Sequence, residues 1–140
     1  MKTIAALFGL LTTFSAIAQP AAAPLPPIEK ADESTIGYQS VDEALAAVRA
    51  DPRARARADR DWLVFEVSRL GQPDHALWYF STPAQASHPS AIKRTIRVRE
   101  GQAVIDMDVK CDAAEEACLN MIRDFQQINL QYQNMLNKPL

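Results

Sequence analysis

Alternating apolar and polar positions fill the middle of the chain and predict a series of β-strands. Residues 62–67 and 76–81 are short runs of aromatic and β-branched residues. Residues 92–99 and 103–110 alternate on either side of Glu100-Gly101, a dipeptide suited to a tight turn. These four runs indicate consecutive antiparallel strands, of which the last two form a hairpin.

A two-residue turn at Glu100-Gly101 would fix the register of this hairpin. Val98 then lies opposite Ala103, and Lys93 lies opposite Asp108. One face of the hairpin becomes apolar, with Ile92, Ile96, Val98, Ile105, Met107 and Val109, whereas the other is largely polar.

Helical patterns flank the strands. Ser40 and Glu43 form a capping box ahead of an apolar stripe, which predicts a helix over Val41–Ala50. Residues 53–58 alternate Arg with Ala, which favours a weak strand but leaves a helical extension open.

A long helix is expected over residues 113–137, with Asp112 as its N-cap. Its apolar stripe would consist of Cys118, Met121, Ile122, Phe125, Ile128, Tyr132 and Met135. The predicted fold is α+β: a meandering antiparallel sheet of about five strands, a short N-terminal helix, and a long C-terminal helix packed on the sheet.

The N-terminal region is typical of export. Lys2, an apolar run and the small residues Ala16 and Ala18 predict a signal peptide over residues 1–18. Residues 19–35 are rich in Pro and Ala and predict a flexible leader, so a single domain is expected over 36–138. The mature protein would be soluble and periplasmic or secreted.

Export favours a disulfide between Cys111 and Cys118, although two free, buried thiols remain an alternative. Seven residues of one helix span about 10.5 Å, whereas bridged Cα atoms lie within about 7 Å. A bridge therefore requires Cys111 to lie outside the helix that carries Cys118.

Charge argues against nucleic acid as a partner. The 140 residues contain 15 Lys and Arg and 17 Asp and Glu, for a net charge of -2. No segment after the signal is apolar for long enough to span a membrane. The oligomeric state is left open.

Local clusters of basic and aromatic residues are the candidate binding surface. Six basic side chains could form a stripe across one sheet face: Arg53, Arg55, Arg57, Lys93, Arg97 and Arg99. The favoured interpretation is a solvated face balanced by Asp106, Asp108 and the acidic start of the C-terminal helix, with the stripe as the first candidate if a partner surface exists. Alternation sends Trp78 and Phe80 to one face and Tyr79 to the other, where Tyr79 is a candidate interface anchor.

Catalytic and metal-binding patterns are weak. Asp74, His75 and His88 lack a close ligand spacing, so ordinary loop histidines are the favoured interpretation and no metal or other cofactor is expected. The chain has no G-x-S-x-G elbow, glycine-rich phosphate loop or HExxH motif. We therefore expect no enzyme.

The segments at residues 76–83, 88–89, 92–95 and 111–118 resemble a group of small exported proteobacterial proteins to which no activity is attached. The resemblance covers about residues 34–130 and assigns no catalytic residue. Members are sometimes labelled J-domain co-chaperones, but a J domain needs His-Pro-Asp between two helices. Here His88-Pro89 is followed by Ser90 and leads into a strand.

The expected function is an exported domain that binds an envelope or secreted protein, for instance as an inhibitor or immunity protein. The alternative is a small-ligand carrier or envelope enzyme with a pocket between the sheet and the C-terminal helix.

Overall fold

The computed structural model describes residues 36–73 and 75–139. The predicted signal peptide and leader lie outside the described residues. The elements in chain order are α1 (Val41–Ala50), β1 (Ala54–Asp59), β2 (Trp62–Val67), β3 (Ala76–Ser81), β4 (Ser90–Arg99), β5 (Gln102–Cys111) and α2 (Glu115–Leu136).

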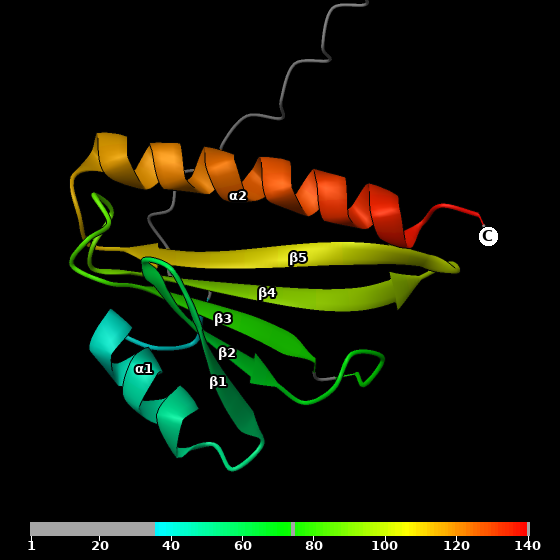
Figure 1. Cartoon of the computed structure of the whole chain (residues 1–140), viewed down its shortest axis with the longest axis horizontal. Helices are drawn as coiled ribbons and strands as arrows, with labels where there is room; N and C mark the ends of the chain where they lie inside the picture. The colour runs from blue at the N-terminus through cyan, green and yellow to red at the C-terminus, as the bar shows by residue number, and fades with distance from the viewer. Residues whose placement is uncertain (1–35, 74, 140) are drawn as a thin grey trace, which may run out of the picture.

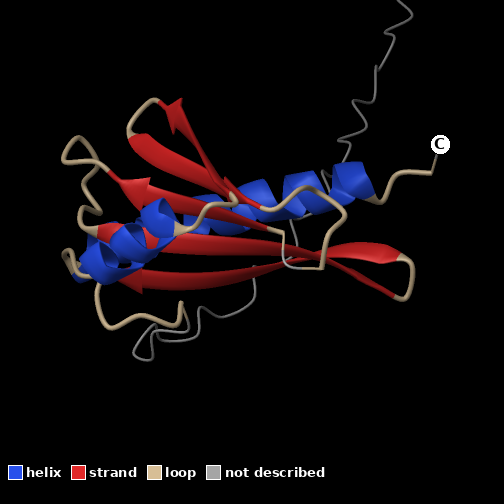
Figure 2. Cartoon of the chain, turned by 90° about the horizontal axis from the view of Figure 1, so that it is seen from below, coloured by secondary structure: helices blue, strands red, loops and turns tan. Residues whose placement is uncertain are grey.

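The five strands form one antiparallel sheet in the order β1-β2-β3-β4-β5. The helices α1 and α2 lie on opposite sides of this sheet, and α2 runs back along β5 (Figures 1 and 2). The predicted α+β class and meander are confirmed. Of residues 53–58, where a helical extension was open, residues 54–58 are extended and pair with β2, whereas Arg53 lies in the turn before the strand.

The β4–β5 hairpin has the predicted register. Val98 pairs with Ala103, and Lys93 pairs with Asp108. Glu100 and Gly101 both have positive φ, 52° and 78°, which matches a two-residue turn between twisted strands. Because every register step is retained, the hairpin separates its apolar face from its polar face as expected.

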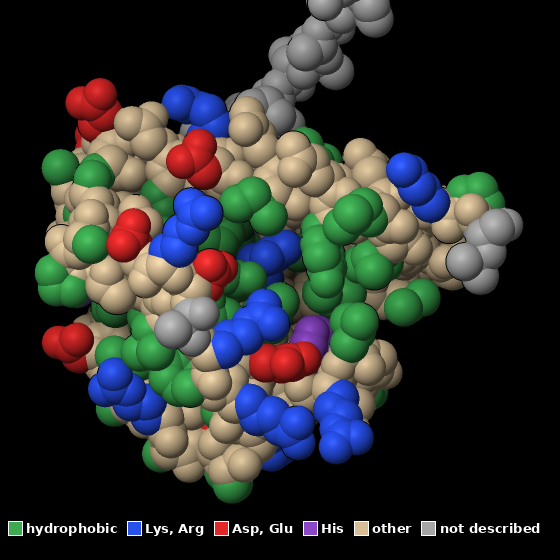
Figure 3. All heavy atoms as spheres, in the orientation of Figure 1, with side chains coloured by type: hydrophobic (Ala, Val, Ile, Leu, Met, Phe, Trp, Pro, Cys, Tyr) green, Lys and Arg blue, Asp and Glu red, His purple; other side chains and the backbone are tan. Residues whose placement is uncertain are grey.

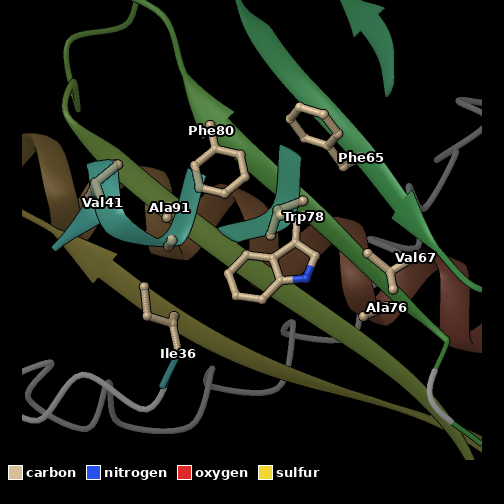
Figure 4. Close-up of a cluster of buried hydrophobic side chains, with 10 residues drawn as sticks. Ile36, Val41, Phe65, Val67, Ala76, Trp78, Phe80 and Ala91 are labelled. Carbon is tan, nitrogen blue, oxygen red and sulfur yellow. The ribbon is translucent and has the colours of Figure 1, made fainter. Parts of the chain in front are cut away.

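One face of the sheet, here called the α1 face, holds an apolar core between the strands and α1. The Ser40 hydroxyl accepts a hydrogen bond from the Glu43 backbone N–H at 3.1 Å, as predicted, whereas the Glu43 carboxylate reaches back to the backbone N–H of Gln39 at 2.9 Å. Trp78 and Phe80 lie side by side against α1, with ring centroids 5.8 Å apart and planes nearly parallel (Figure 4). Phe65 meets Phe80 edge-on and completes the aromatic centre of this core.

The opposite face, here called the α2 face, holds a second core. Its buried residues are Val64, Leu77, Tyr79, Ile92, Met121, Ile122 and Phe125. The 22 residues of α2 span about 33 Å at ~1.5 Å per residue, which matches the length of the ten-residue strand β5. Within residues 36–73 and 75–139, no helix is long and apolar enough to cross a membrane.

The start of α2 differs from the prediction. The helix begins at Glu115 behind Ala114, which makes no side-chain cap, so Asp112 as N-cap is wrong. Cys111 ends β5 and is bonded to Cys118 in the helix, with Cα atoms 5.9 Å apart, as predicted. The backbone N–H of Asp112 donates to Pro89 O at 3.0 Å. The disulfide and this hydrogen bond hold Asp112 in the corner ahead of the helix.

The buried stripe of α2 is also shifted from the prediction. Ile128 and Met135 are exposed, whereas Asn129 is buried. Farther along, the side chains of Gln133 and Asn137 accept hydrogen bonds from the backbone N–H groups of Ile105 and Ala103. These contacts cover part of the free edge of β5 and fix which side of α2 faces the sheet.

Candidate functional site

A cavity of about 320 Å³ lies on the α2 face between the helix and the β1–β2 hairpin. Figure 3 shows this face hollowed between α2 and the hairpin, with hydrophobic and Lys or Arg side chains around the hollow. Its lining includes Trp62 from β2, Tyr79 from β3, Arg94 from β4, and Phe125 and Ile128 from α2. Four elements therefore converge on one space.

Arg94 is the charged group of this cavity. It is only 4% exposed, since it occupies an inward position of β4 between Ile92 and Ile96. Its Nη1 donates a 3.0 Å hydrogen bond to the hydroxyl of Tyr79. Its Nε and Nη2 have no hydrogen-bond partner among the described residues. A buried guanidinium is thus left with an unused pair of donors.

Aromatic rings surround Arg94. The guanidinium carbon lies 5.6 Å from the ring centroid of Tyr79 and 5.7 Å from that of Tyr132, both within cation–π range. Trp62, Tyr79 and Phe125 meet one another edge-on, with centroid distances between 5.1 and 6.4 Å. The rings fix the walls of the cavity and limit how far the guanidinium can move.

A second unsatisfied polar side chain lies close by. The Asn129 amide contacts Met107 Sδ at 3.4 Å, and its Oδ1 has no hydrogen-bond partner among the described residues. Met107 is the cross-strand partner of Arg94. Two polar residues that each keep an unpartnered polar atom among the described residues therefore lie close together between the sheet and α2, where burial without hydrogen bonds is costly.

An apolar hollow of about 620 Å³ continues the site toward the end of α2. Leu70 and Gly71 of the β2–β3 loop border it on one side, and Ile96 and Val98 of β4 on the other, with Leu136 of α2 at its end. Val98 is 75% exposed and Leu70 is 57% exposed. Arg94, Ile96 and Val98 alternate along one face of β4, so this hollow adjoins the cavity over Arg94.

The predicted stripe of six basic residues on one face is wrong. Arg55 pairs with Glu66 and Arg57 with Val64, on the α2 face. The register places the other basic strand residues, Lys93, Arg97 and Arg99, on the α1 face. The prediction failed because the phase of alternation of β1 relative to β4 depends on the strands between them. Tyr79 lies on the face opposite Trp78 and Phe80, as predicted, but it is buried under α2 and does not form an exposed anchor.

The basic residues of the α1 face have local partners. Arg97 and Arg99 both contact Asp106 Oδ2, at 3.4 and 3.3 Å, and Lys93 lies 5.5 Å from the centroid of the Trp78 ring. Lys93 and Arg97 share a groove of about 310 Å³ with Arg53. For Arg97 and Arg99, the favoured prediction of basic residues balanced by Asp106 is therefore confirmed.

Arg53 also has an acidic partner in this groove. Its side chain and its backbone N–H donate to the carboxylate of Asp51 at 2.8–3.1 Å. The side-chain hydrogen bonds, and then the backbone one, lower the pKa of Asp51 below its ordinary value of 3.8. By contrast, neither Arg55 nor Arg57 has an ion-pair partner among the described residues, and both are exposed.

The two histidines lie at opposite ends of β3. His75 Nδ1 is 3.4 Å from Ser68 O and 3.9 Å from Glu66, whereas His88 Nδ1 is 3.0 Å from Ser81 O. Asp74 lies outside the described residues. In the part of the chain that the structure describes, no three His, Cys, Asp or Glu side chains gather closely enough to hold a metal ion.

Arg94 and Asn129 were not among the predicted site residues. The signal for Arg94 was present, because it is the charged position within the otherwise apolar alternation of Ile92, Ile96 and Val98. Asn129 is four residues after Phe125, and one turn of helix places it on the same face. In both cases, a polar residue occupies a position of a predicted strand or helix where the pattern calls for an apolar one, and this signal could have identified both residues.

A scan against protein-family models, a search of curated proteins and a search of solved structures found no match to this chain.

Proposed function

We propose that this protein is a binding domain of the bacterial envelope, without catalytic activity, and that it engages a partner protein through the α2 face. The observation that carries the proposal is the exposed apolar hollow next to the cavity over Arg94. Exposed apolar side chains gathered around a depression are typical of protein–protein interfaces, whereas single exposed hydrophobics are ordinary. Leu70 and Val98 are largely exposed on opposite sides of this hollow.

Charge supports the same face. Arg55 and Arg57 project from β1 on the side of the sheet that carries the hollow, and no acidic group among the described residues neutralises them by an ion pair. Exposed cations at the border of an interface accelerate association with an acidic partner more than they increase its final affinity. An acidic partner surface is therefore the expected complement.

The disulfide supports export. A bond between Cys111 and Cys118 is stable in an oxidising compartment, and the N-terminal sequence has the pattern of a signal peptide. Both features fit a protein that acts in the periplasm or outside the cell.

One observation favours the carrier as a second candidate. The cavity lies where a carrier would need it, between the sheet and α2. Its volume of about 320 Å³ is at the lower end of the ~300–1,000 Å³ that small-ligand sites occupy. That space suits one side chain or a small acid, and the adjoining apolar hollow gives a protein partner further contact area.

The test compares cross-linked complexes of two single-residue variants. Val98→Glu places a charge in the apolar hollow, and Arg99→Glu places the same residue at the next position of β4, on the other face. Both positions are exposed, so both variants should fold. Each protein carries the same affinity tag and is cross-linked in its own cell envelope.

We expect one partner that is recovered with the wild type and with Arg99→Glu, and is reduced at least about tenfold with Val98→Glu, as for a hot-spot residue. Equal recovery of the partner with Val98→Glu would show that the α2 face is not the interface. Recovery of no partner with any of the three proteins would favour the carrier.

A further inference from the structure

The unused donors of Arg94 point to a ligand. Burial of a guanidinium removes its hydration, and the desolvation cost is recovered only when the donors find acceptors. Tyr79 accepts from Nη1, but no acceptor among the described residues binds Nε or Nη2. Arg94 lines the cavity, although Nε and Nη2 themselves have almost no accessible surface, so an acceptor that enters this space must displace the side chains that cover them.

The identity of the two free nitrogens defines the shape of that acceptor. Nε and Nη2 lie on the same edge of the guanidinium plane, so their N–H bonds are parallel and form a two-pronged donor. A planar group with two oxygens on one atom matches this edge with two parallel hydrogen bonds. Carboxylates and phosphates have such oxygens, whereas amides and alcohols do not.

The surroundings favour a singly charged acid over a dianion. Among the described residues, Arg94 is the one Lys or Arg that lines the cavity, while Asp59 and Asp124 bring negative charge to the same space. Both aspartates repel any anion, and they repel a dianionic phosphate more strongly than a carboxylate with a single charge. The aromatic walls of Trp62 and Phe125 favour an apolar body behind the charged group.

We propose that Arg94 is a carboxylate-binding residue, whose Nε and Nη2 hold both oxygens of one carboxylate that a partner protein inserts between α2 and the β1–β2 hairpin. The inference rests on the proposed function in taking the α2 face as the binding surface. The carboxylate belongs to a glutamate or aspartate side chain or to a chain terminus. Arg55 and Arg57 attract the acidic segment, and Arg94 then fixes one of its carboxylates.

The first experiment measures how tightly the paired donors Nε–H and Nη2–H of Arg94 bind small acids and amides of similar shape. Phenylacetate, phenylacetamide and phenyl phosphate are titrated into the full mature protein, and the Nε–H resonance of Arg94 is followed by NMR. We expect phenylacetate to shift this resonance and to bind about ten- to a hundredfold more tightly than phenylacetamide, the ratio for a charge-assisted pair of hydrogen bonds. Equal binding of the amide would overturn the proposal, and so would tighter binding of phenyl phosphate.

Two variants of Arg94 distinguish the contribution of its parallel donors from that of its positive charge. Arg94→Lys keeps the positive charge but loses the parallel donors, and Arg94→Gln loses both. We expect both to lose phenylacetate binding, whereas Arg97→Gln on the α1 face keeps it. If neither Arg94 variant folds, the titration of the wild type still decides, because the Nε–H resonance reports the contact itself.

Peptides test the source of the carboxylate. One pair of capped peptides differs by Glu against Gln, and a second pair ends in Phe with a free carboxylate or an amide. Carboxylate-dependent binding of either acidic peptide, lost in Arg94→Lys, supports a protein source. Binding of phenylacetate without binding of any peptide would overturn that source and assign the site to a free organic acid. This experiment depends on Arg94, whereas the interface test depends on Val98. If Arg94 does not bind a carboxylate, the proposed interface can still be tested separately.

Discussion

The two faces of the sheet differ in how completely they satisfy their polar groups. On the α1 face, stacked aromatic rings fill the space under the helix, and Arg97 and Arg99 find Asp106 at the surface. On the α2 face, Arg94 and Asn129 are buried and retain polar atoms without partners among the described residues. Among the described residues, the unpartnered buried side-chain polar atoms of this sheet therefore all belong to the α2 face.

Under the proposed function, this difference assigns stability to one face and binding to the other. A buried polar group that lacks a partner lowers stability, and such groups are concentrated where a protein interacts with something else. Tyr79 of β3 accepts the one hydrogen bond that the structure gives to the guanidinium of Arg94. Matched substitutions on the two faces should therefore differ in their effects on stability.

The largest effect on stability is expected when one phenylalanine ring is removed from the core of each face. Phe80→Ala should lower the free energy of unfolding by about 3–5 kcal/mol, because Phe80 is 2% exposed within a closed aromatic cluster. Phe125→Ala should cost less, since Phe125 already borders an open cavity that water can enter. Urea denaturation of both variants measures the difference. An equal or larger loss for Phe125→Ala would contradict the division between the faces.

The next effect concerns the corner that joins β5 to α2. Replacement of Cys111 and Cys118 by Ser should lower the free energy of unfolding by about 2–3 kcal/mol, as expected for a short closed loop. The α2 face should also loosen, because the helix loses its anchor at the sheet. Denaturation of the double variant measures the loss, and mass after alkylation without reductant tests the bond. Two labelled thiols in protein from the periplasm would contradict the disulfide.

A gain in stability is expected at Arg94. Arg94→Met fills similar space without a buried charge, so the free energy of unfolding should rise by about 1 kcal/mol. The matched change on the α1 face, Arg97→Met, removes an exposed ion pair and should alter stability by less than about 1 kcal/mol. A loss of stability in Arg94→Met would show that the arginine supports the fold, and would remove the contrast between the faces.

The strands could be predicted from sequence because alternation and turn chemistry are local. The β4–β5 register follows from Glu100-Gly101, and the strands β2 and β3 have their predicted bounds. Facing relations between distant strands could not be predicted in the same way. Arg55 and Lys93 lie on opposite faces because the loops between β1 and β4 set their relative phase, and loop geometry is not periodic.

The candidate site was missed for a related reason. The apolar stripe of α2 was assigned to Ile128 because it is hydrophobic, although Asn129 occupies the position that faces the sheet. Arg94 is absent from the predicted apolar face of β4, although it alternates with Ile92 and Ile96. Residue type predicts burial well where apolar side chains fill a core, and it fails at the few positions where a polar side chain is buried.

The smallest effect is expected at Asp51, where the α1 face satisfies a charge completely. Hydrogen bonds from Arg53 lower the pKa of Asp51, so its contribution to stability is present above the ordinary value of 3.8 and is lost as pH falls through the folded-state pKa. Arg53→Ala should raise the pKa of Asp51 toward 3.8, whereas Arg99→Ala should leave it unchanged. NMR titration of the Asp51 carboxyl carbon measures both. An unchanged pKa in Arg53→Ala would mean that Arg53 does not hold this carboxylate in solution, and the α1 face would then carry an unsatisfied charge of its own.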